Sequence, residues 1–160
     1  MPAMFDEALL LGIASIATVI AGFTAVTAAL SPPGGSWSPV HRIRQRAIVS
    51  TSFNVVFEAL LPVIVFAWLA DARQAVVLSS ALVTLYAAWI VVTRGRQLYQ
   101  AGGLHTWGGR LLFVPGIAAL LLFAANALVL GSVAVFALAL SVQLSVAVIS
   151  FYQLVAVASG

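Results

Sequence analysis

The sequence contains no cysteine and no lysine. The missing cysteine excludes disulfide bonds, thiolate metal sites, cysteine nucleophiles and thiol redox chemistry. The missing lysine excludes a Schiff-base site for retinal or pyridoxal phosphate. The chain also lacks a Walker phosphate loop, a GxSxG nucleophile motif, an HExxH zinc motif and a dinucleotide fingerprint. We therefore expect a protein that is not an enzyme and that binds no cofactor and no metal ion.

Charged residues are also scarce: they make up 7% of the 160 residues, whereas 63% are hydrophobic. A soluble domain carries roughly 25% charged residues, and a chain this short cannot bury so much apolar surface in its own core. The sequence therefore predicts an all-α membrane protein whose main partner is the lipid bilayer. The basic residues are concentrated in two short loops rather than spread over a binding face. We therefore expect no nucleic-acid partner.

The hydrophobic runs predict one domain over residues 1–160, a polytopic bundle of five transmembrane helices. A span needs about 20 apolar residues. Pro32 and the residues around it end the first run, and Ser38-Pro39 is a typical helix start. Residues 111–158 contain no charge; as one helix they would measure about 72 Å, more than twice the hydrocarbon thickness. A break at Gly131-Ser132 therefore separates two spans. The predicted spans are about 8–30, 46–70, 75–93, 111–130 and 133–158.

The arginines predict the orientation of the bundle. Six of the seven lie in the loops after the first and third expected spans: Arg42, Arg44, Arg46, Arg94, Arg96 and Arg110. The opposite side carries Asp6, Glu7, Asp71 and Arg73. The positive-inside rule places the N-terminus outside and the C-terminus in the cytoplasm, as expected for a plasma membrane such as the bacterial inner membrane. The six arginines are also expected to contact anionic lipid headgroups.

Glu58 is a carboxylic acid in the middle of the second expected span. A charge at that depth costs a few kcal/mol, so by default it marks a functional site. Thr51, Asn54 and Glu58 share one helix face, at successive spacings of three and four residues. Pro62 lies one turn beyond, where it frees the Glu58 carbonyl and is expected to act as a hinge. Because no basic residue lies at that depth, we expect a neutral Glu58 that exchanges its proton with a hydrated path.

A second interpretation, which the sequence supports equally, is that Glu58 only forms a hydrogen bond to another helix of the bundle. Its candidate partners are Asn126 on the fourth span and Ser141 and Gln143 on the fifth. The first span also carries two rows of small residues four apart, which permit close helix packing: Ala14, Thr18 and Gly22, and Ala21, Ala25 and Ala29. We therefore expect a homo-oligomer or a subunit of a larger membrane complex.

Three functions remain open from the sequence. The leading hypothesis is a small channel or transporter for protons or cations, in which Glu58 is the binding or relay group and Thr51 and Asn54 extend the polar path. The second is a non-catalytic accessory or assembly subunit of a larger membrane complex. The third is a membrane sensor that binds lipids or anions through Arg94, Arg96 and Arg110.

Overall fold

The computed structural model describes residues 6–29, 39–100 and 107–158. Within them all secondary structure is helical, and five helices are long and apolar enough to cross a membrane. The predicted all-α class and the predicted number of spans are thus confirmed, and the chain is an integral membrane protein with five candidate spans. The elements are α1 (Glu7–Ala29), α2 (Pro39–Leu69), α3 (Ala72–Gln100), α4 (Trp107–Ala125), the π-helical segment η2 (Asn126–Leu130) and α5 (Val133–Ala158).

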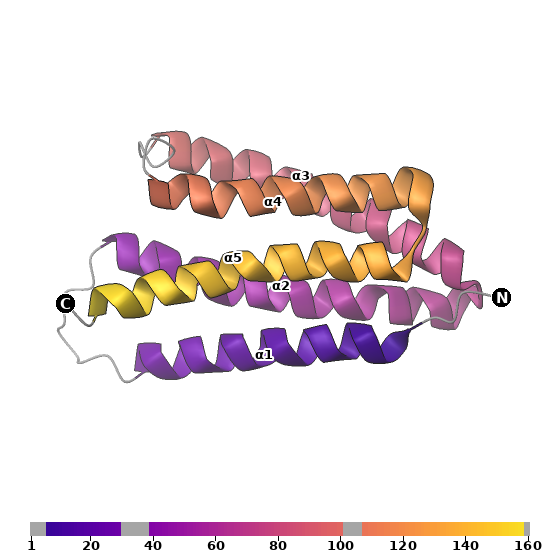
Figure 1. The fold of residues 1–160 in the computed structure, drawn as a ribbon, viewed down its shortest axis with the longest axis horizontal. Helices are drawn as coiled ribbons and strands as arrows, with labels where there is room; N and C mark the ends of the chain where they lie inside the picture. The colour runs from indigo at the N-terminus through magenta and orange to yellow at the C-terminus, as the bar shows by residue number, and fades with distance from the viewer. Residues whose placement is uncertain (1–5, 30–38, 101–106, 159–160) are drawn as a thin grey trace.

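The five helices lie side by side and run alternately in opposite directions (Figure 1). α2 and α5 occupy the middle, with α1 on one side and α3 and α4 on the other. Because the direction alternates, the C-terminal ends of α1, α3 and α5 meet the N-terminal ends of α2 and α4 at one end of the bundle. The other end holds the α2–α3 and α4–α5 connections.

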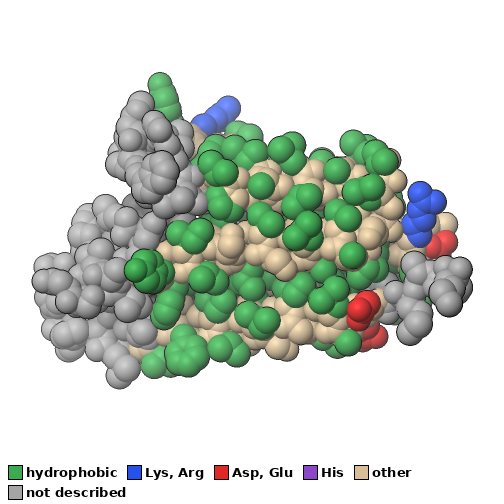
Figure 2. All heavy atoms as spheres, in the orientation of Figure 1, with side chains coloured by type: hydrophobic (Ala, Val, Ile, Leu, Met, Phe, Trp, Pro, Cys, Tyr) green, Lys and Arg blue, Asp and Glu red, His purple; other side chains and the backbone are tan. Residues whose placement is uncertain are grey.

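The core consists of small and apolar side chains between these helices. α1 turns Leu10, Ala14 and Ala17 inward, all of them buried, and packs against α2 and α5. Phe123 of α4 and Phe136 of α5 meet edge to face with ring centroids 5.2 Å apart, a favourable geometry for aromatic pairs. The outside of the bundle is also apolar (Figure 2), and its charged side chains lie near the two ends. A surface of this kind is stable only in contact with lipid.

The two tight connections have clear local causes. Ala70 ends α2 in the left-handed conformation, with φ 52°, and Asp71 accepts a hydrogen bond from the Gln74 N–H at 3.0 Å, which caps the start of α3. Gly131 ends η2 with φ 58°, and its N–H donates to the Asn126 carbonyl at 2.8 Å. A Cβ on Gly131 would lie 3.1 Å from Arg73 Cγ, so the position requires glycine for both conformation and space.

Two helix boundaries agree with the sequence predictions. α2 begins at Pro39 and the break between α4 and α5 falls at Gly131-Ser132, the positions that the sequence indicates. α2 continues unbroken through Pro62, whose ring is buried, so the hinge role of Pro62 stays a prediction. In the two rows of small residues on α1, Ala14 and Ala21 are buried, whereas the other described side chains, Thr18, Gly22 and Ala25, are exposed.

Candidate functional site

Glu58 lies at mid-depth in the bundle. It is the eleventh residue of the 22-residue apolar segment Ile48–Leu69 of α2, and only 5% of its surface is exposed. Neither carboxyl oxygen has a hydrogen-bond partner among the described residues. A buried polar group without a partner is costly and rare in native structures. Glu58 is therefore the group in this bundle whose chemistry most needs an explanation.

Gln143 faces Glu58 from α5. It is the eleventh residue of the 20-residue segment Val133–Tyr152, so both residues lie near the middle of their spans. The Gln143 side chain interacts with the Glu58 carboxyl group, but its buried Oε1 has no hydrogen-bond partner in the described part of the chain. A protonated Glu58 can donate to that oxygen. Depending on which way the amide is turned, the Gln143 N–H groups can instead donate to an ionised carboxylate.

Asn54 and Thr51 extend the polar face of α2 from Glu58 toward the N-terminal end of the helix. Asn54 Oδ1 accepts a hydrogen bond from the Tyr86 hydroxyl of α3 at 3.2 Å, and Thr51 is buried. Tyr86 also stacks on Trp89, with ring centroids 6.3 Å apart. Tyr86 was not predicted from the sequence. Its position within an apolar span could have indicated it, since a hydroxyl group at that depth needs a polar partner.

Buried hydroxyl groups continue from Glu58 toward one end of the bundle. Thr51 precedes Glu58 by seven residues and Ser150 follows Gln143 by seven; because α2 and α5 are antiparallel, both lie about 10 Å from the pair in the same direction. Ser52 is buried there as well, and its Oγ has no hydrogen-bond partner among the described residues. Beyond Glu58 in the opposite direction the core between α1, α2 and α5 is apolar, built by Ile13, Ala59, Phe136 and Leu140. The buried polar side chains toward that end, Ser79, Ser80 and Asn126, lie on α3 and η2.

A cavity of about 280 Å³ lies between α2 and α3 beside Glu58. Its lining residues are Asn54, Phe57, Glu58, Leu61, Leu82, Val83 and Tyr86. Phe57, Leu82 and Tyr86 are exposed on the outside of the bundle, whereas Glu58 and Val83 are buried. The cavity is therefore a groove that opens toward the lipid and has Glu58 at its floor. This site is called the α2–α3 groove below.

The other predicted partners of Glu58 are engaged elsewhere. The Asn126 Nδ2 donates to Ser80 Oγ at 2.9 Å, and its Oδ1 accepts the Ser132 N–H at 2.9 Å. Asn126 thus holds the α4–α5 connection against α3. Ser141 is exposed, and its hydroxyl donates to the Ala137 carbonyl at 2.9 Å. Of the three candidates, Gln143 is the residue that the structure places at Glu58.

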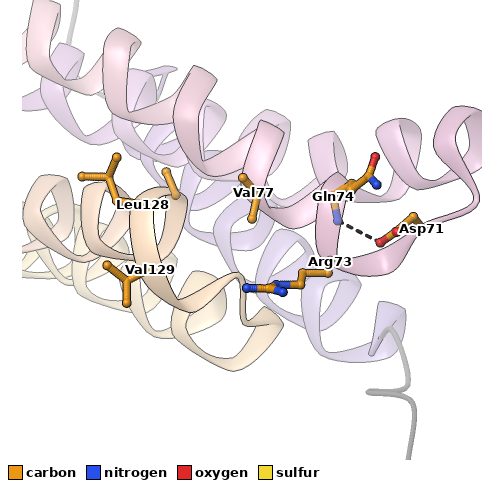
Figure 3. A pocket seen from close by; sticks show the side chains of 7 residues that line it. Asp71, Arg73, Gln74, Val77, Leu128 and Val129 are labelled. Atoms are coloured by element: carbon orange, nitrogen blue, oxygen red, sulfur yellow. Dashed lines mark hydrogen bonds between the residues drawn. The ribbon is translucent and has the colours of Figure 1, made fainter.

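The arginines lie at the ends of the bundle. Arg96 is exposed near the end of α3, while the side chains of Arg42, Arg44, Arg46, Arg94 and Arg110 lie outside the described part of the structure, so their lipid contacts stay predictions. Arg73 lies beside an open cavity of about 380 Å³ between the start of α3 and η2 (Figure 3). Its side chain extends toward the end of η2, where a positive charge suits the negative end of a helix.

Two further findings bear on function. Among the described residues, no group of three His, Asp or Glu side chains is arranged to hold a metal ion. The chain matches no protein-family model, and comparisons with curated proteins and with solved structures found no match. Function must therefore be inferred from the site itself.

Proposed function

We propose that this protein is a small transporter or gated channel for protons or cations, with Glu58 as the exchanging group. The observation that carries the proposal is a carboxyl group at mid-span, 5% exposed, with both oxygens unpaired. Intramembrane acids of this kind mark ion pathways and proton relays. Of the two permeants we favour the proton, because the site offers one carboxyl and one amide, whereas hard metal cations need several oxygen ligands.

Gln143 gives Glu58 a partner in either protonation state. When Glu58 is neutral, its O–H donates to Gln143 Oε1; when it is ionised, the turned amide donates to the carboxylate. A proton can therefore leave and return without leaving a buried charge unsolvated. The hydroxyls of Thr51, Ser52 and Ser150 support a hydrated half-path to one end of the bundle.

The opposite half of the path is closed by apolar side chains of α1, α2 and α5. This asymmetry supports a gated cycle rather than a continuously open pore, with a movement of α2 at Pro62 as the proposed gate. The arginine distribution supports an orientation with the N-terminus outside and the C-terminus in the cytoplasm of a bacterial-type inner membrane. In that orientation the hydroxyl-lined half faces the cytoplasm.

Proton flux into liposomes tests the proposal. The purified protein is reconstituted with a pH-sensitive dye inside the vesicles, and a potassium gradient with valinomycin drives proton movement. The parent protein should carry protons, and Glu58→Gln should abolish that flux. Glu7→Gln is the matched control, because it removes an exposed acid at the start of α1. Absence of flux in the parent, or equal flux in Glu58→Gln, overturns the proposal.

A second candidate function, an assembly subunit of a larger membrane complex, is favoured by the outer face of α1. That face exposes Ser15, Thr18 and Gly22, and no described atom lies within 4 Å of a Cβ built on Gly12 or Gly22. Small exposed residues let another helix approach closely. Native mass spectrometry in mild detergent separates the outcomes: another protein at fixed stoichiometry supports this candidate, whereas a pure homo-oligomer or monomer counts against it.

A further inference from the structure

The α2–α3 groove has a lipid-facing mouth and a polar floor. Phe57 at the mouth is 70% exposed and Leu82 is 46% exposed, whereas Val83 and Glu58 at the floor are 2% and 5% exposed. A molecule dissolved in the bilayer can therefore enter the groove sideways, without passing through either aqueous end. The cavity of about 280 Å³ is close to the lower limit for small-molecule sites, roughly 300 Å³.

The polar groups of the groove specify the chemistry of an occupant. Glu58 has two unpaired carboxyl oxygens, which are buried at the floor, so an occupant must displace the atoms that cover them. The Tyr86–Asn54 hydrogen bond joins two further lining residues. The remaining walls are apolar, with Leu61, Leu82 and Val83 among them. In the sequence Glu58 is the one acid in the middle of a span, and no basic residue lies near that depth. A small apolar molecule that carries a single positive charge complements such a site.

We propose that the α2–α3 groove binds small lipophilic amines that arrive from the bilayer as neutral bases and take the proton of Glu58. The O–H bond of the carboxylic acid breaks and an N–H bond forms on the amine. The products are a carboxylate and an ammonium held in contact, so no net charge enters the membrane and nothing is oxidised or reduced. This binding rests on the proposed function in one respect, because Glu58 must hold a proton that it can release.

The ion pair gives the site its selectivity. A charge-assisted hydrogen bond is roughly twice as strong as a neutral one, and water is largely excluded from the floor of the groove. A molecule of the same shape without a basic nitrogen gains only the contact with the apolar walls. The difference between an amine and its carbon isostere therefore measures recognition by Glu58 separately from partition into lipid.

Equilibrium dialysis with radiolabelled N,N-dimethylphenethylamine tests the inference. The protein is placed in nanodiscs of phosphatidylcholine, and binding to empty nanodiscs is subtracted. We expect saturable binding that Glu58→Gln weakens at least about tenfold, and an affinity at least about tenfold above that of isopentylbenzene, the carbon isostere. Glu7→Gln should leave binding unchanged.

A second variant distinguishes loss of amine binding from loss of folding. Leu82→Trp fills the mouth of the groove from a lipid-exposed position, so it should preserve the fold yet weaken amine binding at least about tenfold. Equal binding of the amine and its isostere, or full binding by Glu58→Gln or Leu82→Trp, overturns the inference. Because the flux assay contains no amine, loss of amine binding with intact Glu58-dependent flux contradicts only the inference, and absent flux contradicts only the proposed transport.

Discussion

Asn126 and Glu58 are both polar side chains buried between the helices, but their hydrogen bonding differs. Asn126 uses both its amide nitrogen and its side-chain oxygen in hydrogen bonds of 2.9 Å, to Ser80 and from Ser132. Glu58 has no hydrogen-bond partner for either oxygen among the described residues. A fully paired polar group stabilises one arrangement, whereas an unpaired one costs stability and is retained for another reason. The comparison supports a structural role for Asn126 and the functional role that we propose for Glu58.

The largest expected effect is on transport through Glu58. Glu58→Gln keeps the size of the side chain but removes the exchangeable proton, so proton flux in liposomes should fall by about two orders of magnitude, the usual contribution of a positioned proton-transfer group. Stability should stay the same or rise, because the variant removes an unpaired acid. If flux and thermal stability in detergent fell together, Glu58 would have a structural role like that of Asn126, and the proposed difference between the two residues would be contradicted.

The second effect concerns stability at Asn126. Asn126→Leu leaves the Ser80 hydroxyl and the Ser132 N–H without their partner, so the free energy of unfolding should fall by about 2 kcal/mol. Chemical unfolding in mild detergent, followed by circular dichroism, measures this change. Proton flux per folded molecule should remain at the parent level. Lost flux in a stably folded Asn126→Leu protein would contradict the structural role of this residue.

The third effect separates Gln143 from its neighbour Ser141. Gln143→Leu removes the group that serves both protonation states of Glu58, and flux should fall about tenfold, less than for Glu58→Gln. Ser141→Ala is the matched control, because Ser141 is exposed and bonds only to the Ala137 carbonyl one turn before it. Parent-level flux in Gln143→Leu would show that Glu58 works without the amide.

The smallest expected effect is on stability at Gly131, in the connection that Asn126 holds against α3. Gly131→Ala places a Cβ on a residue with φ 58° and within 3.1 Å of Arg73 Cγ and Val77 Cγ2. The variant should lose about 1 kcal/mol of stability, the cost of a left-handed conformation for a residue with a side chain. A melting curve in detergent measures the loss, and an unchanged midpoint would mean that the connection relaxes without strain.

The sequence is most informative about features that depend on local pattern. Apolar runs, the Ser38-Pro39 start and the Gly131-Ser132 break indicate the five helices. Glu58 is conspicuous because the apolar segment around it, Ile48–Leu69, holds no other charge. Pairing between helices depends on register, which a local pattern does not carry. Sequence analysis therefore left three partners open for Glu58 and missed the Tyr86–Asn54 hydrogen bond. Counting residues from the span ends would have favoured Gln143, since it shares the mid-depth of Glu58.

The same limit applies to the small residues of α1. Their spacing predicts close packing but not which side of the helix packs within the bundle. The structure buries Ala14, Ala17 and Ala21 against α2 and α5 and leaves Thr18 and Gly22 exposed. The α2–α3 groove was likewise beyond prediction, because its volume depends on how side chains from two helices fail to fill the space between them.

The central claim is that Glu58 is a buried acid that exchanges its proton, and infrared spectroscopy tests it most directly. The protein is reconstituted in lipid, and spectra are recorded before and after transfer from H2O to D2O. We predict a carbonyl band of a protonated carboxylic acid that shifts in D2O and is missing in Glu58→Gln. A spectrum without this band, or a band that is insensitive to D2O, would contradict the claim.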